Sequence, residues 1–229
     1  MTLLESGSFR PTGRPFELAG TPCCLAAGPH DSAFVIYGGA GVATYWNVPG
    51  NHWALVDLDA GITDAEGTLD VKAPVWAAMS PDGRYAAATG DNGEVEIIDL
   101  RSGRPVGGPV TRGQAAGVYW AAFSQDGSRL VTTAVDGSVV LWDTRRAEVR
   151  ATVQISGNQD GWAPNAAEFR PDGRTLLIAP ELGHALYVWD PSAERAIAFA
   201  CRMAGRDLSE AEWAENFPGQ TFQHVCPGK

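Results

Sequence analysis

The sequence predicts an all-β chain built from repeated four-stranded antiparallel sheets. Three observations carry this prediction: turns of the Asp-Gly type recur along the chain, an apolar strand follows each turn, and most of these units end in an aspartate. With 229 residues, the chain is long enough to bury a substantial core within one β-rich domain.

The repeat becomes visible when the ends of the apolar strands are placed in register. The matching segments are "ATYWN" ending at Asn47, "VEIID" at Asp99, "VVLWD" at Asp143 and "LYVWD" at Asp190, spaced by 52, 44 and 47 residues. The turn residues that precede them in register are His30, Asp82, Asp126 and, with one inserted residue, Asp172. Self-similarity at such a period is the sequence sign of a repeat architecture.

Each copy predicts the same four strands in the same order. In the third copy, "VYWAAFS" is a first strand, an Asp-Gly turn stops it, and "RLVTTAV" is the second strand. The hairpin sequence "VDGS" then leads to "VVLWD", and the more polar "EVRATVQI" is the fourth strand. One such sheet cannot bury both of its faces alone, so the copies are expected to stack radially.

These copies resemble the blades of the WD-repeat (transducin-like) β-propeller family in "SPDGR…GDNG…IID", "SQDGS…VDGS…LWD" and "RPDGR…VWD". The likeness covers about residues 18–200 and implies about four complete blades after an N-terminal partial blade. The expected limits are 1–17 for the partial blade and 18–60, 69–107, 113–155 and 162–200 for the complete blades.

The resemblance also implies which residues hold the blades together. In the family, an aspartate in the turn between the second and third strands fixes the blade by hydrogen bonds. This role carries over to Asp91 and Asp136, but not to the last copy, which has "PELGHA" at that place. The other expected blade-structural residues are the strand-end residues Trp142, Asp143, Trp189 and Asp190. The Gly-His dipeptide that usually precedes the first strand is absent from every copy. We therefore expect an incomplete hydrogen-bonded network, with packing supplied by Trp76 and Trp120.

The tail, residues 201–229, predicts one short helix at about 210–216. Ser209 and Glu212 form a capping box, and Leu208 and Trp213 occupy the positions of a hydrophobic staple. Pro218-Gly219 ends the helix, which we expect to seal the last blade. The pattern "ACR…AGR…L…EW…PG…CP" resembles the ending of many bacterial, actinomycete-type WD-repeat proteins. Those chains often carry a signal-transduction ATPase module, and sometimes a DNA-binding transcriptional-activation module, ahead of the propeller.

The blade count falls short of the seven that are usual in the family. The segment "FRPTGRPFELAG" resembles the one that closes the second copy, so the chain is expected to begin inside a blade. Three explanations stay open: the end of a longer propeller, which we favour, a small ring of divergent blades, or a ring assembled from two chains. An incomplete ring would expose sheet edges and leave room for self-assembly.

Composition excludes several classes of partner. A net charge of −10 disfavours nucleic acid, because polyphosphates need a basic surface. No run of 18 or more apolar residues predicts a membrane span, and "MTLLESGSFRPTGRP" does not read as a secretory signal. We therefore expect a cytoplasmic protein. There, Cys201 and Cys226, which are separated by 25 residues, would stay reduced.

No pattern predicts catalysis, a cofactor or a metal site. None of the four histidines accompanies a nucleophile and a carboxylate in a recognisable order, and no cysteine stands in a C-x-x-C pair. Asp82, Asp126 and Asp172 recur at one turn position and are expected to form turns. The glycine-rich "YGGAGVATYW" lacks the Lys-Ser/Thr ending of a phosphate loop, and Cys23-Cys24 are expected in the core.

The remaining hypothesis is a non-enzymatic scaffold that binds a protein or peptide through loops at one end of the blades. The candidate partner-binding residues are Arg112, Gln114, Gln159, Asp160, Trp162, Glu181 and His184. Trp162 breaks register with Trp76 and Trp120, so it is either an exposed anchor for a partner or packed against a neighbouring blade. The alternative function is the propeller portion of a prolyl-oligopeptidase-like hydrolase or of a periplasmic translocation-type protein, since "SPDGRYAA" also occurs there.

Overall fold

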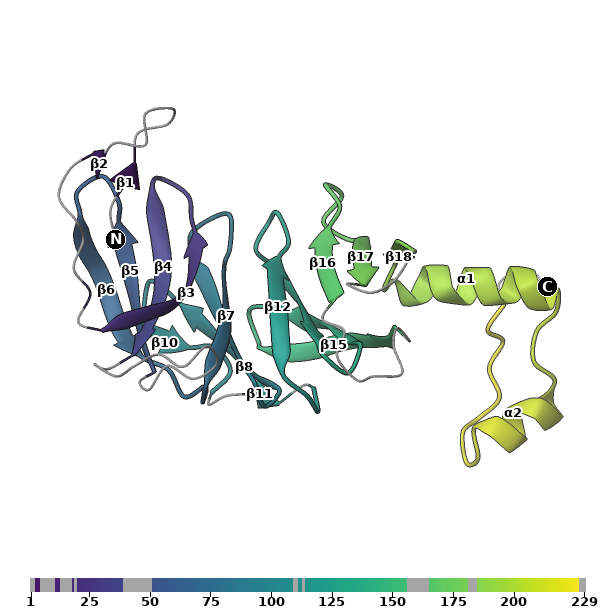
Figure 1. Cartoon of the computed structure of the whole chain (residues 1–229). Coiled ribbons are helices and arrows are strands. Elements are labelled where there is room, and N and C mark those ends of the chain that lie inside the picture. The colour runs from purple at the N-terminus through teal and green to yellow at the C-terminus, as the bar shows by residue number, and fades with distance from the viewer. Residues whose placement is uncertain are drawn as a thin grey trace. The chain divides into compact units, whose positions relative to one another are not determined.

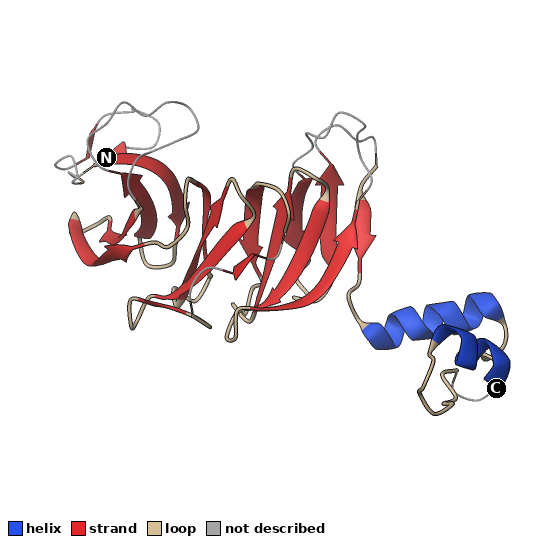
Figure 2. Cartoon of the chain, turned by 90° about the horizontal axis from the view of Figure 1, so that it is seen from below, coloured by secondary structure: helices blue, strands red, loops and turns tan. Residues whose placement is uncertain are grey.

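The computed structural model describes residues 3–4, 11–12, 18, 20–38, 51–108, 111–112, 114–155, 165–180 and 185–226. The chain divides into two compact units, Met1–Val188 and Trp189–Lys229. The first unit carries the β-sheets and the second carries two helices (Figures 1 and 2).

Four consecutive antiparallel sheets make up most of the first unit. The first sheet is β3 (Thr21–Ala27), β4 (Ser32–Gly38), β5 (His52–Asp57) and β6 (Ile62–Thr68). The second is β7 (Pro74–Met79), β8 (Tyr85–Gly90), β9 (Glu94–Asp99) and β10 (Arg104–Pro105), with β11 (Thr111–Arg112) also paired to β9. The third is β12 (Val118–Phe123), β13 (Arg129–Ala134), β14 (Ser138–Asp143) and β15 (Glu148–Gln154). The fourth is β16 (Asn165–Phe169), β17 (Leu176–Pro180) and β18 (Tyr187–Trp189), and β1 (Leu3–Leu4) pairs with β2 (Pro11–Thr12).

The sheets stack face to face in chain order, and their first strands β3, β7, β12 and β16 are successive neighbours (Figure 1). Phe34, Ile36 and Trp53 of the first sheet share one buried cluster with alanines and Ile98 of the second. A second cluster joins β8 and β9 to the third sheet around the fully buried Trp142. These two clusters bury sheet faces against one another, as blades of a propeller do, and the predicted all-β propeller architecture is confirmed.

The prediction for the third strand of the first blade was wrong. The strand is β5, which ends at Asp57, and not "ATYWN" ending at Asn47. Asp57 pairs with Ser32 as Asp143 pairs with Arg129, so Asp57 is the true strand-end aspartate. The cause is a longer connection: residues 39–51 lie between β4 and β5, whereas the equivalent connections are 91–93 and 135–137.

The predicted limit of the last blade, residue 200, was also wrong. The strands of the fourth sheet end at Trp189, and helix α1 occupies Ala193–Ala204. Ser192 caps this helix by accepting a hydrogen bond from the backbone N–H of Arg195, and Gly205 ends it at φ 69°. Both are standard helix boundaries, but the repeat spacing had extended the blade across them.

Helix α2 spans Glu210–Asn216, as predicted, and the capping box of Ser209 and Glu212 is present. Trp213 is buried within this second unit and contacts the rings of Phe217 and Phe222, with centroids 4.6 and 5.9 Å apart. Whether α2 seals the last blade depends on how the two units are placed, and this stays a prediction. Neither helix of the described residues is long and apolar enough to cross a membrane.

All four cysteines are paired in disulfides. The expectation that Cys201 and Cys226 stay reduced applied to a cytoplasmic setting, and it stays a prediction. Cys23 is joined to Cys24 on β3, and Cys201 of α1 is joined to Cys226. Cys23 and Cys24 are partly buried and pack against the cluster between the first two sheets, so they lie at the edge of the core and not inside it as expected.

Candidate partner-binding face

The connections at one end of the stacked sheets gather into a surface that we call the loop face, defined by residues 69–73, 91–93, 114–117 and 135–137. Backbone hydrogen bonds join its parts: Asp91 N–H donates to the Ala73 carbonyl at 3.2 Å, and Val135 N–H donates to the Gly117 carbonyl at 3.0 Å. Gly93 has φ +83°, and a Cβ there would overlap the Gln114 carbonyl oxygen. The turn at 91–93 therefore packs directly under the segment that enters the next blade.

Two buried glutamates of β9 hold the segment that enters the second blade. Glu96 Oε2 accepts hydrogen bonds from the backbone N–H groups of Asp70 at 2.7 Å and Val71 at 3.2 Å. Glu94 Oε2 accepts one from Lys72 N–H at 2.8 Å. The two carboxylates are only 3–4% exposed, and burial raises the pKa of Glu96 although the two N–H groups oppose that rise. These bonds satisfy backbone groups that would otherwise be orphaned at the strand entry.

In the third blade, a glutamine anchors the equivalent network. Trp142 Nε1 donates to Thr132 Oγ1 at 2.8 Å, and Thr132 Oγ1 donates to Gln114 Oε1 at 2.7 Å. Gln114 Nε2 donates to the carbonyl and hydroxyl oxygens of Ser138, at 2.9 and 3.0 Å. Asp136 Oδ1 closes the network by accepting from Ser138 N–H at 2.9 Å and from its hydroxyl at 2.6 Å.

This chain of bonds corrects two expectations. The network of the third blade was expected to be incomplete without a Gly-His dipeptide, but the Gln114 amide bridges the loop to the strands. Gln114 was also expected to face a partner, but it is 7% exposed and both of its amide atoms are bonded within the blade. It is therefore part of the scaffold beneath the loop face.

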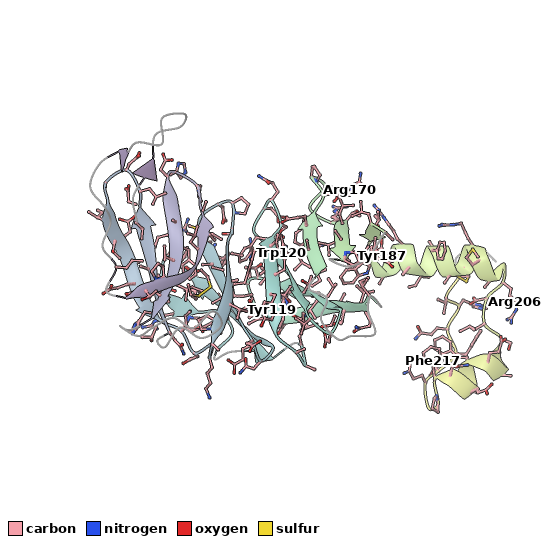
Figure 3. All side chains as sticks on the ribbon, viewed as in Figure 1. Tyr119, Trp120, Arg170, Tyr187, Arg206 and Phe217 are labelled. Carbon is pink, nitrogen blue, oxygen red and sulfur yellow. A yellow bond between two sulfur atoms is a disulfide. The ribbon has the colours of Figure 1, made fainter. Side chains whose placement is uncertain are left out.

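The tryptophans of the first strands link neighbouring blades, as expected. Trp76 and Trp120 stack with ring centroids 4.8 Å apart. Trp76 Nε1 donates to the Ala121 carbonyl at 3.3 Å. Trp120, labelled in Figure 3, repeats this bond from its Nε1 to the Ala167 carbonyl at 3.0 Å. Each indole thus donates to the first strand of the following blade.

Tyr119, which sequence reasoning missed, connects two blades at the loop face itself. A register shift between Val118 and Trp120 leaves Tyr119 as a bulge residue of β12. Its hydroxyl donates to Asp91 Oδ1 of the preceding blade at 2.6 Å. Burial, together with this bond and the Asp91 charge, raises the pKa of Tyr119 to about 12.

Replacing Asp91 with asparagine should lower the pKa of Tyr119 part of the way toward that of an ordinary tyrosine, because it removes the negative charge while desolvation, the largest cause of the shift, remains. An ultraviolet absorbance titration of the wild type and the Asp91→Asn variant, with Tyr119→Phe to assign the transition, measures this pKa. An unchanged Tyr119 transition in Asp91→Asn would show that the carboxylate does not control this side chain.

At the opposite end of the sheets, the recurring aspartates form turns and not an acid/base pair. Asp126 Oδ1 accepts from the Ser124 hydroxyl at 2.7 Å, and Asp82 Oδ1 accepts from the Ser80 hydroxyl at 2.6 Å. Backbone N–H groups of Thr175 and Arg174 lower the pKa of Asp172 to about 2. Hydrogen bonds within the turn lower the pKa of Asp126 as well, and carboxylates held ionised, as those of Asp126 and Asp172 are, suit proton transfer near neutral pH poorly.

Two of the strand-end aspartates, Asp143 and Asp190, form close pairs with arginines. Asp143 pairs with Arg150 at 2.5 Å, which lowers the pKa of Asp143, and Asp190 pairs with Arg195 at 2.6 Å. Within the described residues, no three His, Cys, Asp or Glu side chains gather as metal ligands would.

Most of the predicted partner-binding residues cannot be placed. Arg112 lies on β11, which pairs with β9 below the loop face. Five candidates lie outside the described residues: Gln159, Asp160, Trp162, Glu181 and His184. Within the described part of the loop face, the exposed side chains include those of Asp70, Lys72, Asp91, Asn92 and Asp136.

Comparison with known proteins agrees with this geometry. The family described as "WD domain, G-beta repeat" matches residues 107–143, which span the third blade through Asp143. Repeats of this kind generally mediate protein–protein interaction. No curated protein sequence matches the chain.

Among solved structures, the chain resembles one from Kuenenia stuttgartiensis hydrazine synthase, with a TM-score of 0.57 and 16% identity. The alignment covers 78% of this chain and 48% of the hydrazine synthase chain. This chain therefore spans about half the length of the hydrazine synthase chain. A likeness at this identity shows the fold alone.

Proposed function

We propose that this WD-repeat β-propeller chain is a non-enzymatic module that binds a protein or peptide through its loop face. The observation that carries the proposal is the way the loops are held. Buried Glu94, Glu96 and Gln114 fasten the backbone from below, while polar side chains of the same segments stay exposed. Loops preorganised in this way lose little conformational entropy when a partner binds.

The charge of the loop face favours a partner with basic groups. Three of its exposed side chains are aspartates, Asp70, Asp91 and Asp136, and one is a lysine, Lys72. The whole chain carries a net charge of −10. Complementary charge across an interface accelerates association and selects among partners.

In the finer form of the proposal, the chain is the C-terminal sensing or regulatory part of a larger bacterial signalling or transcriptional-regulator protein of the cytoplasm. The resemblance of its tail to the ending of actinomycete-type WD-repeat proteins supports this. The fold alone does not exclude a hydrolase propeller, so turnover is tested beside binding.

The binding test compares two charge reversals at opposite ends of the sheets. Once a partner has been isolated, Asp70→Lys should slow its association several-fold, and raising the salt concentration should narrow the difference. Asp59→Lys is the matched control, because Asp59 is an exposed aspartate in the β5–β6 turn and its reversal changes the net charge equally.

Two results would contradict the proposal. If Asp70→Lys and Asp59→Lys changed the association rate equally, the loop face would not be the binding site. Hydrolysis of generic esters or peptides by the purified chain, if lost on replacing His184, would instead establish an enzyme.

A further inference from the structure

The C-terminal unit, Trp189–Lys229, has very little core of its own. Among its described residues, only Trp213 and Cys226 are buried, and α1 contains no buried residue. A helix of 12 residues is marginal in water without packing partners. Units of this size generally need a cross-link in addition to their apolar contacts.

Its polar contacts are numerous. The Arg206–Glu212 pair lies at the surface, whereas the Asp207 side chain is 12% exposed. Arg206 forms two hydrogen bonds to the Glu212 carboxylate, at 2.6 and 2.7 Å. Asp207 accepts from the backbone N–H groups of Leu208 at 2.9 Å and Val225 at 3.2 Å. The exposed Arg206–Glu212 pair adds little stability, and the bonds to Asp207 orient the segment around α2 without giving it an apolar core.

One covalent bond fastens this segment to α1. Cys201 lies in the last turn of α1, Cys226 follows α2, and their Cα atoms are 5.5 Å apart in the disulfide. This Cα–Cα separation lies in the range usual for disulfides in folded proteins. Closing a loop of this length shifts the folding equilibrium by roughly a hundredfold.

We propose that the Cys201–Cys226 disulfide is a reversible redox latch, closed when the C-terminal unit is folded and opened by a dithiol reductant. The proposal does not depend on what the loop face binds. In a reducing cytoplasm the latch would open, and an oxidising compartment or an oxidant would close it.

The exchange reaction starts at the more accessible sulfur. Cys201 is partly exposed whereas Cys226 is 7% exposed, so a thiolate of the reductant attacks Cys201 Sγ. A mixed disulfide forms, and Cys226 leaves as a thiolate that takes a proton. The second thiolate of the reductant then attacks the reductant sulfur that is bonded to Cys201. This releases Cys201 as a thiolate, which also takes a proton. The reductant supplies two electrons and becomes a cyclic disulfide.

Protection of the helices reports on this unit alone, because both described helices belong to it. Hydrogen exchange of the full chain, measured with and without dithiothreitol, should show roughly hundredfold faster exchange in α1 and α2 after reduction. Exchange in β8 and β13 should not change, which controls for loss of the whole fold. Peptide mapping without reduction should recover Cys201 linked to Cys226.

Two double variants complete the test. Cys201→Ser with Cys226→Ser should exchange rapidly in both helices whether or not dithiothreitol is present. Cys23→Ser with Cys24→Ser should keep the response of the wild type. Helices that stay equally protected after reduction or in the first variant would overturn the proposal, as would failure of an oxidant to form the Cys201–Cys226 peptide.

Discussion

Replacement of Thr132 with valine should lower the free energy of unfolding by about 2–5 kcal/mol. Thr132 is fully buried, and its hydroxyl both accepts from Trp142 Nε1 and donates to Gln114 Oε1. Valine has nearly the same shape but removes both bonds, so an indole N–H and an amide oxygen would be left buried without partners. Urea denaturation, followed by fluorescence and circular dichroism, measures the change.

Thr152→Val is the matched control for this substitution. Thr152 is exposed on β15, where it pairs with Val140, and its replacement should change the free energy of unfolding by less than about 0.5 kcal/mol. If Thr132→Val were as mild as Thr152→Val, the hydrogen-bonded network would not hold the third blade together.

Replacement of Trp120 with alanine should cost about 3 kcal/mol, because the ring joins three consecutive blades. It stacks on Trp76 of the second blade, extends from the third, and donates to the Ala167 carbonyl of the fourth. Its loss removes apolar contact and leaves the carbonyl of a fully buried residue without its donor. Hydrogen exchange should show the fourth sheet opening first, since it has a blade neighbour on one side within the described residues.

Trp120→Phe separates the two contributions of this residue. Phenylalanine keeps an aromatic ring against Trp76 but cannot donate to Ala167, so about 1 kcal/mol of the loss should remain. Equal losses for Trp120→Phe and Trp120→Ala would assign the whole effect to the hydrogen bond and none to stacking.

The second and third blades were predictable because their turns nearly repeat. "SPDGR" and "SQDGS" place Gly83 and Gly127 at φ +68° and +66°, and the spacing of 44 residues sets the register of every strand. The first blade breaks this rule. Its turn uses His30 and Asp31 at positive φ, and the longer connection at 39–51 moved the apparent strand end from Asp57 to Asn47.

Helix α1 was missed for a related reason. Spacing between copies predicts where the next strand belongs, but it carries no information once the repeat stops. The capping residues Ser192 and Gly205 are visible in the sequence, and residues of these types are the local signals for the two ends of a helix.

The residues that organise the candidate site could be only partly inferred. Glu94 and Glu96 alternate with the apolar Val95 and Ile97 in β9, and buried carboxylates need hydrogen-bond donors, so their role was in principle predictable. The role of Gln114 was not, because it depends on the approach of a loop to Ser138 and Thr132. The link between Tyr119 and Asp91 depends equally on how one blade meets the next.

Site-specific photo-crosslinking tests most directly whether the loop face binds the partner. A photoreactive amino acid is placed at Asn92, on the loop face, or at Arg101, exposed in the turn between β9 and β10 at the opposite end. The account predicts that the full chain with the probe at Asn92 forms an adduct with the isolated partner, while the probe at Arg101 forms none. Adducts from Arg101 without adducts from Asn92 would contradict it.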